Sequence, residues 1–350
     1  MAHEITATDG IILARIPAWH RLGTVLDNAF TWSDALKGAS LNWNVEKRQL
    51  LDPIAKLPID RWGIFRVDTG DYMGDCGKDY TPLQNYTIGQ VMDAIVEAEG
   101  GAHYDVAGSI RGGKQVWAQI ALRDAIRIKG TDDKSDVRLT GIADHSGKLA
   151  NRWFTSATRI VCANTMRIAE LNQDKMRNAE FRITHSGDVD LKIANVRKTL
   201  TEAHDGVKSF NDKLNFLATR EANMTIVKEF VQTYFPRVIE DADGKHSATQ
   251  RTAARKVLEN FESNDSNAIP KVKGTAYNLY NAVTEWADHS RGGVRKGTFE
   301  TTEQARAFGA VLGAGNTLKQ VALDSIMELV QSGPKSKSGA GVDKILSMVA

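Results

Sequence analysis

The sequence predicts an α+β fold, with a mostly antiparallel β-sheet and one or two packed helices up to about His185 and only helices after it. In the first part, short segments rich in β-branched and aromatic residues alternate apolar and polar positions, which is typical of half-buried strands. From Val189 the apolar positions recur every three or four residues, which is typical of amphipathic helices. The chain has 350 residues, 42% of them hydrophobic, which is enough for two domains with a substantial core.

The strands of the first part are joined by tight turns, and this favours antiparallel pairing because such turns cannot join parallel strands. Turn signals at residues 68–70 and 111–114 predict two hairpins, and another signal stands at 146–147. A helix is predicted from Thr87, as its N-cap, through Glu99, ended by the glycine pair at 100–101. The predicted strands are residues 42–50, 61–67, 102–110, 115–122, 137–144 and 159–163.

The first helix of the second part, from Val189 to Leu217, has apolar residues spaced alternately four and three apart. This heptad pattern favours a long helix that associates with another helix, so we expect a homo-oligomer. The alternative is an ordinary amphipathic helix docked on its own domain, and Gly206 argues against an isolated zipper. The predicted contact residues of self-association are Val196, Leu200, Val207, Phe210 and Leu214.

Further amphipathic helices are predicted at residues 224–235, 247–261, 275–289 and 302–330, the last interrupted at 313–315. The stretch after Gln331 is rich in Ser, Gly, Lys and Pro, a composition that does not pack. The predicted organisation is therefore an α+β domain at 1–185, a helical domain at 186–331 and a flexible tail at 332–350.

Charge and cysteine usage exclude several classes of protein. The 45 basic and 43 acidic residues nearly cancel, so overall charge neither requires nor excludes a nucleic-acid partner. Cys76 and Cys162 are far apart, which supports neither a disulfide framework nor a thiolate metal site. No histidine stands at a recognised ligand spacing, and we expect no metal and no cofactor. The first residues do not read as a signal peptide, so we expect a soluble cytoplasmic protein without a membrane partner.

One segment has the glycine and lysine spacing of a phosphate-binding loop, from Gly108 to Lys114. Such a loop needs a Ser or Thr after its lysine and a helix beyond it, whereas Gln115 and a strand-like segment follow here. We therefore interpret these glycines as a hairpin turn.

Local charge is more informative. From Val106 to His185, 14 Lys and Arg stand against 8 Asp and Glu, and Trp117, Trp153 and Phe154 lie among them. Cations neutralise phosphates and aromatic faces stack on unpaired bases, so this pattern predicts a groove for single-stranded nucleic acid. The alternative is a solvated sheet face whose aromatic residues belong to the core. The predicted phosphate contacts are Arg111, Lys114, Arg152 and Arg159, with Trp153 as the stacking residue.

Two motifs carry a family resemblance: residues 18–24, with Trp19, His20 and Gly23, and residues 159–165, with Cys162 and Asn164. Together with residues 66–85 and 107–122, they resemble an uncharacterised family of phage and plasmid-like proteins from bacteriophages, prophages and conjugative plasmids. The resemblance covers most of the chain and implies a location inside bacterial cells. It implies no activity, because the family is a domain of unknown function.

The antiparallel hairpins, packed helix and basic face are also similar in broad architecture to phage single-strand annealing proteins. Our sequence-based hypothesis is a phage-type DNA-binding protein that binds or anneals single strands in recombination or replication, as an oligomer and without covalent chemistry. One alternative is a phage protein that binds a host protein through its helical surface to block defence. Another is an enzyme whose site is assembled from Asp144, His145, Cys162 and Asn164, although Cys162 is predicted to be structural.

Overall fold

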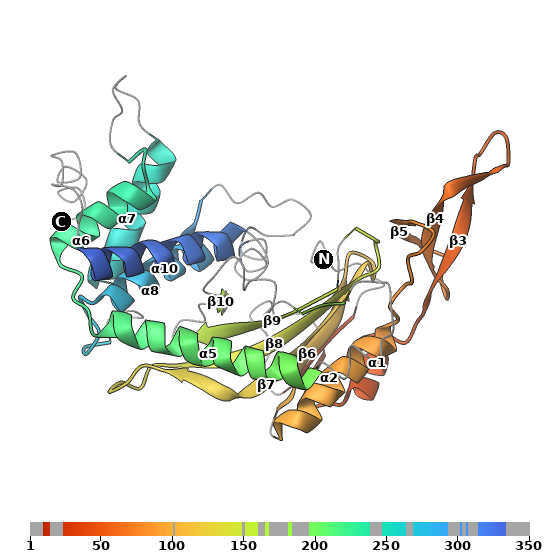
Figure 1. The fold of residues 1–350 in the computed structure, drawn as a ribbon, viewed down its shortest axis with the longest axis horizontal. Helices are drawn as coiled ribbons and strands as arrows, with labels where there is room; N and C mark the ends of the chain where they lie inside the picture. Colours follow the sequence, from red (N-terminus) through yellow and green to blue (C-terminus); the bar gives the residue numbers. More distant parts are fainter. Residues whose placement is uncertain are drawn as a thin grey trace.

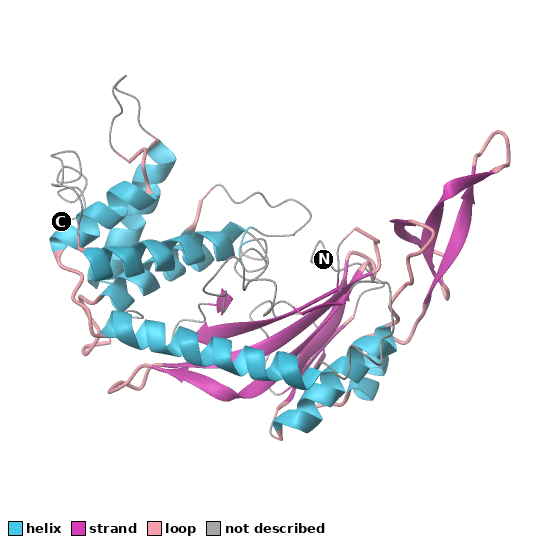
Figure 2. Cartoon of the chain, viewed as in Figure 1, coloured by secondary structure: helices cyan, strands magenta, loops and turns pink. Residues whose placement is uncertain are grey.

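The structure is a computed structural model, and it has the α+β architecture predicted from the sequence (Figure 2). Strands dominate the N-terminal part, and helices make up the described residues of the C-terminal half. The structure describes residues 10–14, 24–100, 102–148, 151–159, 165–167, 181–183, 196–238, 247–263, 269–292, 302, 306 and 314–333.

The main sheet has the strand order β10-β9-β8-β7-β6-β1-β2, with β11 also paired to β9. All its pairs are antiparallel except β1 with β2. The predicted strands at 102–110, 115–122 and 137–144 are confirmed as the centre of this sheet. Its strands are β1 (Ile11–Ala14), β2 (Thr24–Leu26), β6 (His103–Ile110), β7 (Gln115–Arg127), β8 (Lys134–Asp144), β9 (Asn151–Arg159), β10 (Thr165–Arg167) and β11 (Phe181–Ile183).

A separate three-stranded antiparallel sheet projects from the body of the molecule (Figure 1). It contains β3 (Val45–Leu51), β4 (Pro58–Arg66) and β5 (Tyr72–Cys76). The hairpin predicted at 68–70 is confirmed as the connection between β4 and β5. At its base, the amide side chain of Gln84 accepts from the Val45 nitrogen and donates to the Val45 carbonyl, both at 2.9 Å. We call this sheet the arm.

Two helices accompany the sheets. The short helix α1 (Trp32–Gly38) begins with a capping box, in which the Asp34 nitrogen donates to Thr31 Oγ1 at 3.2 Å and the Thr31 nitrogen to Asp34 Oδ2 at 2.9 Å. Helix α2 (Asn85–Glu99) ends at Gly100 in the left-handed conformation, as predicted. The predicted N-cap Thr87 was wrong, because the N-cap is Gln84, three residues earlier.

The C-terminal helices lie at the predicted amphipathic segments, with a close match for the segments at 224–235, 247–261 and 275–289. They are α5 (Val196–Ala218), α6 (Met224–Tyr234), α7 (Ala248–Ser263), α8 (Ala276–Glu285), the π-helical turn η1 (Trp286–Ser290) and α10 (Ala314–Ser332). The turn η1 directs Asp288 into the helices, where Lys319 Nζ of α10 donates to Asp288 Oδ1 at 2.7 Å; both side chains are buried. Burial lowers the pKa of the Lys319 amine, and the Asp288 carboxylate partly offsets this.

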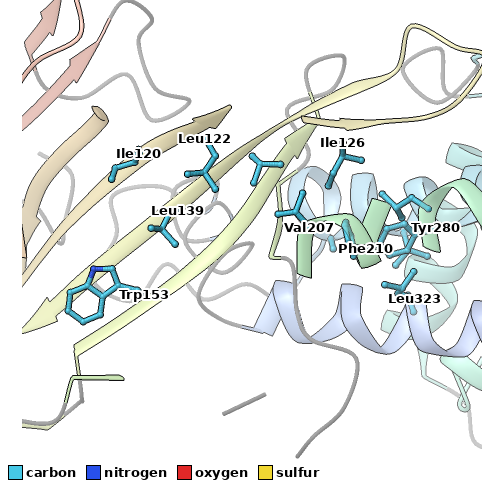
Figure 3. Close-up of a cluster of buried hydrophobic side chains, with 14 of the residues drawn as sticks. Ile120, Leu122, Ile126, Leu139, Trp153, Val207, Phe210, Tyr280 and Leu323 are labelled. Carbon is cyan, nitrogen blue, oxygen red and sulfur yellow. The ribbon is translucent and has the colours of Figure 1, made fainter. Parts of the chain in front are cut away.

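Helix α5 runs along the main sheet and joins it to the helices (Figure 1). Val207, Phe210 and Leu214 on its apolar face are at most 3% exposed, and Figure 3 shows the first two between Ile126 of the sheet and helices α8 and α10. The predicted self-association through these residues was therefore wrong, because their apolar surface is covered by the same chain. Val196 and Leu200 belong to α5, but their side chains lie outside the described residues.

One cluster of buried side chains runs from the main sheet through α5 into the helices. A buried hydrogen bond adds to it, since the Tyr277 hydroxyl of α8 donates to Asp133 Oδ2 in the β7–β8 loop at 2.7 Å. The domain boundaries at 185 and 331 stay a prediction, and residues 334–350 of the predicted tail lie outside the described residues. None of the described helices combines the length and apolar character needed to cross a membrane.

Candidate nucleic-acid interface

The turn between β6 and β7 carries the first two predicted phosphate contacts, Arg111 and Lys114. Arg111, Gly112 and Gly113 all have left-handed backbone conformations, with φ of 60°, 69° and 82°. These conformations close a tight turn between two paired strands, so no helix follows the glycines. The prediction of a hairpin in place of a phosphate-binding loop is confirmed. Arg111 is exposed and Lys114 is half-buried.

The neighbouring loop, residues 144–148 between β8 and β9, is folded around the Asp144 carboxylate. Asp144 is 2% exposed, and it accepts from Ser146 Oγ at 2.6 Å, from the Lys148 nitrogen at 3.2 Å and from Gln115 Nε2 at 3.3 Å. Its charge is thus directed at donors inside the protein, whereas Lys148 is exposed at the surface. The two turns are joined, because the His145 nitrogen donates to the Lys114 carbonyl at 2.8 Å.

His145 connects this loop to α2 and to Trp43, which precedes β3 of the arm. The ring is 1% exposed, and its Nε2 lies 2.8 Å from Asn85 Oδ1. Because Asn85 Nδ2 donates to the Leu41 carbonyl at 2.9 Å, its Oδ1 is the acceptor and the ring donates through Nε2. The ring also meets the edge of Trp43, with 5.2 Å between centroids. These contacts make His145 a structural residue.

The consecutive residues Asp144, His145 and Ser146 do not form a catalytic triad. Ser146 donates to the Asp144 carboxylate, while the His145 ring faces Asn85, so the hydroxyl proton points to the carboxylate and not to the imidazole. Cys162 and Asn164, the other residues of the enzyme alternative, lie outside the described residues. Within the described ranges, no group of three or more His, Cys, Asp or Glu residues could hold a metal ion.

The arm docks on the same loop. Gly74 of β5 lies so close to the loop that a Cβ atom there would collide with the Ser146 carbonyl oxygen. The Tyr80 hydroxyl, just after β5, donates to the Asp144 carbonyl at 3.5 Å. The loop is therefore held from three directions, by the turn at 111–114, by α2 and by the arm.

The four predicted cations do not lie together. Arg152 pairs with Ile142 two residues before Asp144, so it belongs to the same end of the sheet as the turn at 111–114. Arg159 pairs with Ser135 at the opposite end, about 23 Å away along β9. The side chains of Arg152 and Arg159 are outside the described residues. The structure thus groups Arg111, Lys114, Lys148 and Arg152 at one end, which we call the basic end.

Trp153 cannot serve as the predicted stacking residue, because it is 1% exposed. It pairs with Gly141 of β8, and a Cβ at that glycine would lie 2.7 Å from Trp153 Nε1. Figure 3 shows the ring beside Leu139 among the core side chains. Phe154 is also buried, at 2% exposed. Trp153 and Phe154 therefore belong to the core, which was the alternative to the stacking hypothesis.

Sequence reasoning missed Tyr86, an exposed aromatic residue that follows the Asn85 bonded to the loop at 144–148. It is 52% exposed and stands in the first turn of α2, directly after the Asn85 that bonds His145. The first turn of α2 contains no acidic residue, and the positive end of the helix dipole lies there. The predicted cap at Thr87 had placed Tyr86 outside the helix, which hid this arrangement.

The family described as Domain of unknown function (DUF932) matches residues 73–311, more than half of the chain. The chain belongs to the DUF932 family. The matched part begins in β5 and contains the turn at 111–114, the loop at 144–148 and helices α5 to α8. No curated protein and no solved structure matches the chain.

Membership in DUF932 confirms the expected domain family of unknown function, while the phage origin stays a prediction. Of the motif residues, Cys162 and Asn164 fall within the DUF932 match, and Trp19, His20 and Gly23 precede it. All five lie outside the described residues.

Proposed function

We propose that this DUF932 protein binds single-stranded nucleic acid across the basic end of its main sheet. The observation that carries the proposal is the pair of joined turns, which hold Arg111, Lys114 and Lys148 beside the strand position of Arg152. Cations on a rigid frame bind a phosphate backbone with little loss of conformational freedom. The frame here is rigid because its polar groups bond to one another.

Electrostatics at this end favour a polyanion. The carboxylate of Asp144 accepts three hydrogen bonds from within the fold, so it is turned away from a ligand at the surface. Each cation that neutralises a phosphate releases a condensed counterion, which makes binding favourable at low salt.

Tyr86 supports a preference for single strands. A half-exposed aromatic ring stacks on an unpaired base without needing a particular sequence, and a base in a duplex has no free face to offer. Tyr86 takes the role that the sequence suggested for Trp153. Binding and annealing of this kind need no cofactor and no covalent step, and we place the activity in phage DNA recombination or replication in the bacterial cytoplasm.

A salt titration tests the proposal. Fluorescence anisotropy of a labelled single-stranded oligonucleotide should show binding at low salt, with log affinity falling by about 0.7 per phosphate contact for each decade of salt. Replacing Arg111 and Lys148 together with Ala should make the slope shallower by about 1.4.

The matched control replaces Arg127 and Lys129 with Ala, because both are exposed but lie at the other end of the sheet. That variant should keep the wild-type slope. Equal loss in both variants, or no binding at the lowest salt, would overturn the proposal. The second of these results would favour the alternative of a host-protein partner bound through the helical surface.

A further inference from the structure

The far end of the arm exposes a group of large apolar side chains. Beyond Gln49 and Trp62 the arm is only the two-stranded ribbon of β3 and β4. We call residues 51–59 the ribbon tip. Its apolar side chains are Leu51, Ile54, Leu57 and Ile59, which are 53%, 91%, 65% and 40% exposed. Grouped exposure of this kind marks an interaction site more often than isolated exposed residues do.

Backbone hydrogen bonds hold the ribbon tip in one conformation. Asp52 Oδ1 accepts from the Ile54 nitrogen at 2.9 Å and from the Ala55 nitrogen at 2.6 Å. The Lys56 nitrogen donates to the Asp52 carbonyl at 2.9 Å, and the Asp52 nitrogen to the Leu57 carbonyl at 2.8 Å. The tip is therefore preorganised, so a partner that covers Ile54 pays little ordering entropy.

A surface groove with an apolar floor and a charged rim lies between α5 and Met327 of α10, with a volume of about 370 Å³. Phe216 and Met327 supply its apolar part. Charged residues of both signs surround them: Asp205, Asp212, Lys208 and Lys213. Burial lowers the pKa of the Lys213 amine, in keeping with its partly enclosed position.

Figure 1 shows the arm projecting from one end of the longest axis, while α10 and the C-terminal end of α5 lie away from it in the body, so the tip and the groove of one molecule do not meet. We propose that the ribbon tip of one copy docks into the α5–α10 groove of a second copy. The groove's two carboxylates offer partners for Lys56 of the tip, and its two amines offer partners for Asp60, which follows the tip. A contact between two different surfaces repeats, so copies add head to tail into a ring or an open filament.

Other binding partners fit the ribbon tip less well than a second copy does. Asp52 and Asp60 flank its apolar residues and would repel a phosphate backbone. Sideways addition of a strand to β3 meets Glu46, Lys47 and Arg48, the kind of charged residues that protect sheet edges. The inference is independent of the nucleic-acid proposal, and its test contains no nucleic acid.

Sedimentation velocity over a range of protein concentrations tests the contact. Wild-type protein should form species larger than a monomer, and Ile54→Asp should weaken this association roughly ten- to one-hundred-fold. Ile54 is almost fully exposed, so the variant should fold normally, as far-UV circular dichroism will verify. The control Met224→Asp adds the same charge at another exposed apolar residue, which is 44% exposed, and should assemble like the wild type.

Mixing two one-sided variants tests the head-to-tail geometry. Asp205→Lys with Asp212→Lys alters only the groove, and both residues are exposed. Each variant alone should be monomeric, but a mixture with Ile54→Asp should form a one-to-one dimer and stop there, because one intact tip and one intact groove remain. Adding Lys56→Glu to the groove variant should restore assembly.

Three outcomes would overturn the proposal. The first is a wild type that stays monomeric at every concentration. The second is an Ile54→Asp variant that assembles like the wild type. The third is a groove variant that still dimerises by itself, which would indicate contact between two tips.

Discussion

The two ends of the main sheet are built from similar hairpins but use their polar groups differently. At the basic end, the loop at 144–148 bonds to itself, to the adjacent turn and, through His145, to Asn85 of α2. At the opposite end, the backbone beside β7 bonds to helix α5, with the Lys129 nitrogen donating to Asn215 Oδ1 at 2.8 Å and Asn215 Nδ2 to the Arg127 carbonyl at 2.9 Å. One end joins the sheet to the C-terminal helices, and the other presents cations to solvent.

The largest expected effect is on stability, and it tests whether Trp153 is a core residue beneath the basic end. Trp153→Ala should lower the free energy of unfolding by about 3–5 kcal/mol, because a buried ring is lost and a cavity remains. Chemical denaturation measures the change. Trp62→Ala, on the half-exposed arm, provides a comparison and should cost less. If the Trp153→Ala variant were as stable as the wild type and had lost only nucleic-acid binding, Trp153 would be a binding residue and not a core residue.

The next largest effect is on stability at the opposite end of the sheet, where β7 and β8 meet the C-terminal helices. Tyr277→Phe removes the hydroxyl that donates to the buried Asp133 carboxylate, and it should destabilise the protein by about 1.5–3 kcal/mol. The matched control is Tyr86→Phe, which removes a hydroxyl from a half-exposed ring and should change stability by less than about 0.5 kcal/mol. Equal effects in thermal denaturation would contradict the difference drawn between the two ends.

The smallest expected effect is on binding at the basic end. Tyr86→Ala should weaken binding of a single-stranded oligonucleotide by about 1–3 kcal/mol while leaving the salt slope nearly unchanged, because stacking releases few ions. Anisotropy at two salt concentrations measures both quantities. Unchanged affinity would show that the basic end binds through its cations alone.

Much of the fold could be predicted from the sequence because its elements are periodic. The helices at α6, α7 and α8 and the strands β6 to β8 follow their apolar spacing closely. Helix α1 has only seven residues, too few for periodicity, although Thr31 and Asp34 have the spacing of a capping box. Strand β5 contains a glycine where it approaches Ser146, which interrupts the alternation.

The candidate sites were harder to predict because spacing does not reveal what covers a surface. The apolar face of α5 has the spacing of a coiled coil, yet Val207, Phe210 and Leu214 meet the sheet and helices of their own chain. Trp153 stands among basic residues in the sequence, but neighbouring positions of a strand face opposite sides of a sheet. Exposure of Tyr86 and Ile54 depends on where α2 and the ribbon end, and no periodic pattern records that.

The buried pair of Asp288 and Lys319 makes the docking of α10 a cooperative step. Lys319 gives the buried Asp288 carboxylate an ion-pair partner on α10, and an unpaired buried charge is penalised by several kcal/mol. Intermediates in which η1 is packed but α10 is detached are therefore disfavoured during folding. The π-helical turn η1 and α10 should therefore pack in one cooperative transition, because the ion pair forms only when both are in place.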